Sequence, residues 1–157
     1  MLIKLGVPAL LGCFWWAGYR LREAGNHRKA KAFAARGDRG KALHYMLLSL
    51  SSFRFNKAHD TPRSLLKDLT RLEQEIREAI RFVHSGSGHV NTVSLFKNIK
   101  SQKEILSQTS NFLHGKWDWQ VSMLKPDFRQ RYDQLRAELP VLLDDFKRTC
   151  QPFASAV

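Results

Sequence analysis

Histidine and cysteine are the residue types best suited to metal binding or nucleophilic catalysis. This 157-residue chain contains six histidines and two cysteines. The histidines show no HxxxH or HExxH spacing, which is how a helix presents two ligands to one zinc ion. The cysteines, Cys13 and Cys150, lie near opposite ends of the chain and form no CxxC pair. We therefore expect no metal site, no disulfide framework and no cofactor.

Neighbouring carboxylates could supply general acid–base catalysis, and the densest set is Glu73, Glu75 and Glu78. Cations lie among them in the sequence, so we interpret this set as the solvated flank of a helix. Neither GxGxxG nor GxxxxGK[ST] occurs, and no convincing strand is present to precede such a phosphate loop. The sequence predicts a protein that is not an enzyme.

Excess positive charge is the chemical feature that remains. The chain has 26 Lys and Arg residues against 14 Asp and Glu residues, a net charge of +12, and an isoelectric point near 10.2. This balance indicates a polyanionic partner, such as RNA, an anionic lipid surface or an acidic protein face. The residues predicted to contact anionic lipid headgroups, cardiolipin among them, or another polyanion are Arg20, Arg22, Arg28, Lys29 and Lys31.

These cations follow residues 1–19, in which Lys4 is the only charged side chain. At about 1.5 Å per residue a helix of this length covers about 28 Å, close to the ~30 Å hydrocarbon core of a bilayer. The segment lacks the cleavage site of a secretory signal and the Arg-rich start of a transit peptide, so we expect it to be retained. It predicts a transmembrane anchor, with a buried apolar arm as the alternative.

Three small residues recur at every fourth position of the predicted anchor and are expected to pack against another membrane helix: Ala9, Cys13 and Ala17. Its C-terminal end carries a predicted interfacial aromatic belt of Trp15, Trp16 and Tyr19. Because the cations follow the span, the positive-inside rule places the remainder of the chain in the mitochondrial matrix or the bacterial cytoplasm.

Residues 20–56 are typical of a basic helical hairpin. Gly37 and Asp38 fall at a turn, Lys41-Ala42-Leu43 opens a second helix, and Tyr45 and Ser49-Leu50 follow. In this layout residues 32–50 resemble one repeat of the tetratricopeptide family. The resemblance implies a helical hairpin but no peptide-binding groove, because such solenoids need about three repeats to close a core. The expected packing residues are Phe33, Leu43, Met46, Leu47 and Leu50.

Residues 57–157 predict a small helical bundle with a Gly/Ser linker at 85–88. Thr61 is suited to cap the first helix, with Pro62 at its first position. An apolar seam then recurs at spacings of three and four: Leu65, Leu69, Leu72, Ile76, Ala79 and Val83.

A second bundle helix is expected to begin after Asn91 or Thr92 and to end near Gly115. Gln102 interrupts its apolar stripe, which indicates lower burial or a polar partner. The connector that follows carries Trp117 and Trp119, either a partner docking surface or a buried end of the bundle. The last helix starts at Pro126, and Pro140 is predicted to kink or restart it.

The predicted fold class is all-α, with a single N-terminal transmembrane helix, a basic hairpin and a small bundle. With no chemistry found, we favour a non-catalytic accessory subunit of an inner-membrane complex, a mitochondrial respiratory-chain complex or ATP synthase, that packs on other subunits. Its expected location is the mitochondrial inner membrane with the C-terminal domain in the matrix, or a bacterial inner membrane with a cytoplasmic domain. The alternative is an organellar ribosomal protein that binds rRNA through its basic segments.

Overall fold

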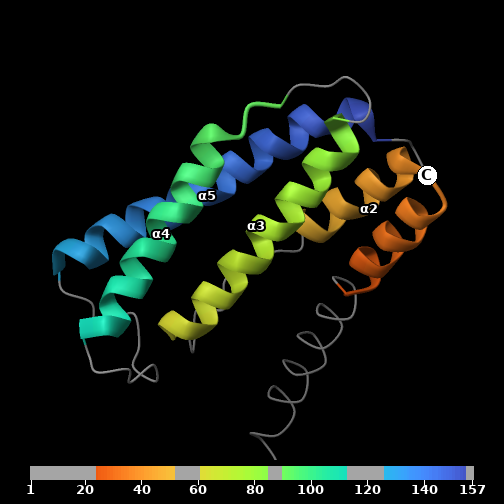
Figure 1. Ribbon diagram of the computed structural model, residues 1–157. Helices are drawn as coiled ribbons and strands as arrows, with labels where there is room; N and C mark the ends of the chain where they lie inside the picture. Colours follow the sequence, from red (N-terminus) through yellow and green to blue (C-terminus); the bar gives the residue numbers. More distant parts are fainter. Residues whose placement is uncertain (1–23, 52–60, 85–89, 113–125, 155–157) are drawn as a thin grey trace, which may run out of the picture. The chain divides into compact units, whose positions relative to one another are not determined.

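The computed structural model describes residues 24–51, 61–84, 90–112 and 126–154, whose regular elements are all helices (Figure 1). No strand occurs within these ranges, so the predicted all-α class is confirmed for them. The chain divides into two compact units, residues 1–53 with 154–157, and residues 54–153. Each unit is taken by itself below.

The predicted transmembrane helix is contradicted. Among the helices that the structure describes, none combines the length and the apolar character needed to cross a membrane. Residues 1–19, where the anchor was expected, lie outside the described residues, and with them the predicted packing face and aromatic belt. The fold class is therefore corrected to all-α without an assigned membrane anchor.

The first unit contains a helix over residues 24–35 and helix α2, Arg39–Ser51. Gly37 follows the first helix with φ of 79°, a left-handed conformation that glycine adopts without a steric penalty. The N–H of Gly37 donates to the carbonyl of Ala34 at 3.0 Å, and the N–H of Asp38 donates to the carbonyl of Phe33 at 3.0 Å. This pair of bonds is a Schellman motif, which ends the helix at the turn.

Helix α2 begins immediately after this turn because Asp38 caps it. The Asp38 carboxylate accepts a hydrogen bond from the backbone N–H of Lys41 at 3.1 Å, and its carbonyl accepts the first bond of the helix, from Ala42. Helix α2 buries one apolar face, formed by Ala42, Leu43, Met46, Leu47 and Leu50. Four of the five predicted packing residues are thus buried, and the fifth, Phe33, is half-buried.

The second unit begins with α3, Pro62–His84. Thr61 Oγ1 accepts from the N–H of Ser64 at 3.2 Å, and Ser64 Oγ accepts from the N–H of Thr61 at 3.1 Å. Thr61 therefore caps α3 and Pro62 is at its first position, as predicted, and the reciprocal bonds with Ser64 complete a capping box. All six residues of the predicted apolar seam have exposures of 0%.

Helix α4, Val93–Phe112, packs against both α3 and α5, Pro126–Cys150, and a short 3-10 turn, η2, Gln151–Phe153, contacts α5 (Figure 1). Asn91 Oδ1 accepts from the N–H of Val93 at 3.2 Å, which helps to start α4. Helix α5 continues through Pro140, so the predicted restart does not occur. An internal proline costs about 3 kcal/mol, and the buried side chains of Leu139 and Leu143 on either side of it offset this cost.

Candidate polyanion-binding surface

Two aromatic rings join the helices of the first unit. Phe33 lies near the end of the first helix and Tyr45 in the second turn of α2, and the Gly37 turn brings them together. Their ring centroids are 5.4 Å apart and their planes differ by 4°, so the rings are stacked. The His44 ring meets Tyr45 edge-on at 5.3 Å. Both stacked rings are half-buried, so this pair forms part of the surface of the hairpin.

Three cations lie over these rings. Lys29 Nζ is 5.1 Å from the centroid of Tyr45, while Lys41 Nζ and Arg36 Cζ are 5.6 Å and 5.8 Å from the centroid of Phe33. Each such contact contributes about 0.5–1 kcal/mol at an exposed site. We call these five residues the cation–aromatic array. Its rings limit where the three positive charges can move.

The charge around the array is almost uncompensated. Residues 24–51 contain six Lys or Arg residues and one acidic residue, Asp38. The Asp38 carboxylate is already used by the helix cap and lies 3.7 Å from Lys41 Nζ. Lys29 and Arg36 are exposed, and the side chain of Lys41 is 40% exposed. An anion in solution therefore has access to all three cations.

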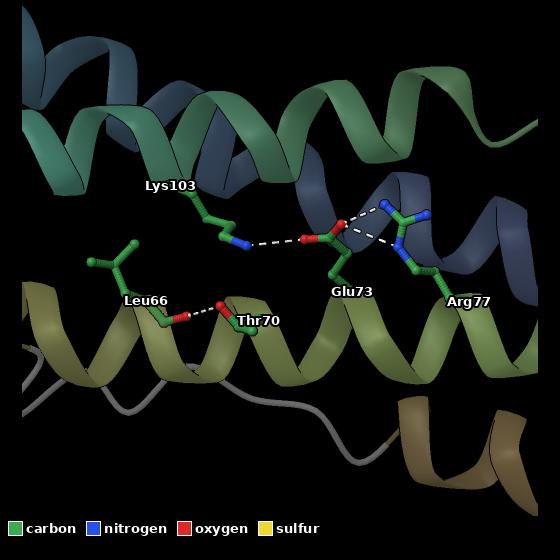
Figure 2. A network of polar contacts seen from close by, with 5 residues as sticks. All are labelled: Leu66, Thr70, Glu73, Arg77 and Lys103. Carbon is green, nitrogen blue, oxygen red and sulfur yellow. Dashed lines mark hydrogen bonds and ion pairs between the residues drawn. The ribbon is translucent and has the colours of Figure 1, made fainter.

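A second charged cluster joins α3 to α4, and in it two cations share one carboxylate (Figure 2). Glu73 Oε1 accepts from Arg77 Nη2 at 2.6 Å and Nε at 3.2 Å, and Glu73 Oε2 accepts from Lys103 Nζ at 3.0 Å. The hydrogen bond from Arg77 lowers the pKa of Glu73 most, burial opposes it, and Lys103 adds to the lowering. The Arg77 guanidinium also lies 4.7 Å from the Phe96 ring centroid. These contacts join the two helices, and both cations of the cluster are already paired with Glu73.

A third polar cluster lies between α4 and α5. Asn98 Nδ2 donates to the Leu135 carbonyl at 3.0 Å and to Glu138 Oε2 at 2.8 Å. Gln102 Nε2 donates to Asn98 Oδ1 at 2.7 Å, while Gln102 Oε1 has no hydrogen-bond partner. Gln102 is 0% exposed and Asn98 3%. The prediction that Gln102 marks a less buried helix is therefore wrong, because its amide meets polar groups of the chain itself.

The structure places some of the residues predicted to bind a polyanion. Arg28, Lys29 and Lys31 are exposed on the first helix, and Lys29 belongs to the array. The other predicted site residues lie outside the described residues: Ala9, Cys13, Trp15, Trp16, Ala17, Tyr19, Arg20, Arg22, Trp117 and Trp119.

Sequence reasoning did not assign Arg36, Lys41 or Tyr45 to the site. The available signal was the placement of aromatic residues on both sides of the Gly37 turn, each with cations nearby. Metal chemistry has no candidate among the residues that the structure describes, since they contain no group of three His, Cys, Asp or Glu side chains able to hold an ion.

No family model, curated protein or solved structure matches this chain. The tetratricopeptide resemblance accordingly stays confined to residues 32–50, and any function must be argued from the site itself.

Proposed function

We propose that this protein is a binding subunit of a larger assembly and that it contacts a polyanionic surface through the cation–aromatic array. The observation that supports this role is the placement of Lys29, Arg36 and Lys41 over the stacked rings of Phe33 and Tyr45. The role is non-catalytic: the array holds charge and offers no acid–base pair.

Positioned cations bind an anion more effectively than flexible ones because less conformational freedom is lost on binding. Ordering a long side chain at an interface costs about 0.5–1.5 kcal/mol. The rings already restrict the three cations of the array, so part of this cost is met in the free protein. The net charge of +12 adds long-range attraction for any polyanion.

The array favours the alternative drawn from the sequence, an RNA-containing assembly, over an inner-membrane complex. Three cations beside one aromatic pair, with a single carboxylate nearby, suit a surface of regularly spaced phosphates. Packing against the helices of other membrane subunits would instead use an apolar face, and the membrane anchor has no part in this proposal.

The test is co-sedimentation of the full chain from lysates of its native host. The wild-type chain is expected to travel with a large particle, and the triple variant Lys29→Ala, Arg36→Ala, Lys41→Ala is expected to stay near the top of the gradient. A matched control, Lys67→Ala, Arg81→Ala, Lys97→Ala, removes the same charge from exposed positions of the second unit and should travel like the wild type. Equal sedimentation of the array variant and the wild type would overturn the proposal.

A further inference from the structure

We infer that the cation–aromatic array recognises the phosphodiester backbone of a nucleic acid duplex and makes no contact with the bases. This inference rests on the proposed function and narrows it to one partner chemistry. It is carried by how the rings of Phe33 and Tyr45 are used in the structure.

Proteins that grip single-stranded nucleic acids stack the bases on free aromatic faces. In the array, the Phe33 and Tyr45 rings stack on each other with centroids 5.4 Å apart. Lys41 and Arg36 lie over Phe33, and Lys29 lies over Tyr45. A base that stacked on either ring would have to compete with these contacts. The rings act as supports for charge, which leaves the phosphate oxygens as the groups that the array contacts.

A duplex suits such a surface better than a single strand does. Its bases are stacked inside, and its two backbones carry about one negative charge per 1.7 Å along the axis. A set of cations that does not stack bases binds more strongly to this higher charge density. The bases inside the duplex are inaccessible, but the array does not need to contact them. Contacts to phosphate carry no sequence information, so binding should not depend on base sequence.

An anionic membrane is the other phosphate-rich surface, and the described part of the hairpin fits it less well. Helices that lie on membranes place large apolar side chains beside their cations, where they enter the acyl region. In residues 24–51 the one large apolar side chain that is exposed is Leu48, at 40%. The exposed positions near Lys29 on the first helix are Arg28, Lys31 and alanine. This surface attracts phosphate without an apolar face to insert.

The experiment measures binding of the full chain by fluorescence anisotropy over a series of salt concentrations. The probes are a duplex RNA of about 20 base pairs, the duplex DNA of the same sequence, its single strands, and vesicles containing phosphatidylserine. We expect both duplexes to bind more tightly than the single strands or the vesicles. A change of base sequence should leave the affinity within about twofold.

The array variant Lys29→Ala, Arg36→Ala, Lys41→Ala should bind duplex at least about tenfold more weakly. Its slope of log affinity against log salt should be shallower by about two to three, near one per lost phosphate contact. The control variant Lys67→Ala, Arg81→Ala, Lys97→Ala should keep a slope within about one of the wild type. Circular dichroism of each variant checks that the helices are intact.

Tighter binding to single strands, with a preference among bases, would overturn the inference and show that the rings open to stack. Tighter binding to vesicles than to duplexes would overturn the inference in favour of lipid headgroups. Equal losses of duplex affinity in the array variant and the control variant would also overturn it, because the array would then have no special role. The wild-type chain could bind none of the duplexes while its array variant still fails to co-sediment with the large particle. In that case the duplex inference fails and the proposed function stands. RNA and DNA duplexes bound equally well support phosphate recognition, while a preference for RNA supports it with a contact to the A-form backbone.

Discussion

Phe33 and Tyr45 lie stacked with ring centroids 5.4 Å apart, although they are twelve positions apart in the chain. The Schellman motif at Gly37 and the cap at Asp38 leave no room for a longer loop, so the two helices meet directly at the turn. The position of the three cations over the rings therefore depends on the backbone of the turn as well as on the side chains.

Replacing Gly37 should destabilise the hairpin through its backbone conformation alone. Its φ is 79°, and a Cβ built there meets nothing within 4 Å, so no clash is involved. We expect Gly37→Ala to lower the free energy of unfolding by about 1 kcal/mol, and Gly37→Asn to lower it less. Urea titration of both variants measures the difference. Equal stability of wild type and Gly37→Ala would show that the left-handed turn is not required.

The two buried amides between α4 and α5 should differ in their importance. Asn98 supplies the hydrogen bonds to Leu135 and Glu138, so Asn98→Ala should cost about 2–3 kcal/mol. Gln102 leaves its own Oε1 without a partner, so Gln102→Met, similar in shape, should cost about 1 kcal/mol or less. Denaturant midpoints of the two variants give the comparison. A larger loss at Gln102 than at Asn98 would contradict this account.

Glu73 should make the stability of the second unit depend on pH. Its ion pairs with Arg77 and Lys103 lower its pKa in the folded state below the ordinary value of 4.5. Their stabilisation is therefore fully present above the unfolded pKa and is lost as pH falls through the folded pKa.

At pH 7 we expect Glu73→Gln to be less stable than the wild type by about 0.5–1 kcal/mol, the usual range for partly exposed pairs. The gap should shrink below about pH 4.5 as the wild-type carboxylate is protonated. Urea unfolding of both proteins over this pH range measures it. A gap that stays constant down to about pH 3 would show that the ion pairs contribute nothing.

Cys150 should resist alkylation in the folded protein. It is 0% exposed, and burial raises the pKa of its thiol to about 11. At pH 8 this lowers the thiolate fraction about 100-fold relative to a thiol with the ordinary value of 9.0. In a Cys13→Ser variant, iodoacetamide should label Cys150 rapidly only after unfolding in guanidinium, as followed by mass spectrometry. Equally fast labelling of the native protein would mean that the end of α5 opens readily.

Several elements could be predicted from the residues because their causes are local. Thr61 caps α3 through the N–H of Ser64, within one turn, and the apolar residues from Leu65 to Val83 recur with the helical period. Pro140 shows the limit of such local rules. It predicts a kink or a restart, and the restart does not occur: α5 continues through Pro140, with Leu139 and Leu143 buried on either side of it.

The predicted N-terminal anchor is also corrected. Hydropathy and length were its basis over residues 1–19, which lie outside the described residues. The structure finds no membrane-spanning helix among the residues that it describes. The net positive charge is unaffected by this correction, because it is a property of the composition. Which surface carries it is known only from the folded structure.

Helix type, caps, buried seams and net charge follow from residue identity at spacings of about four, because hydrogen bonds and side-chain faces within a helix act over that distance. Contacts between helices obey no such period. That Asn98 and Gln102 of α4 both donate to the Leu135 carbonyl of α5, and that Phe33 stacks on Tyr45 beside three cations, depends on the packing of separate segments. Only the folded chain brings those groups within reach of each other.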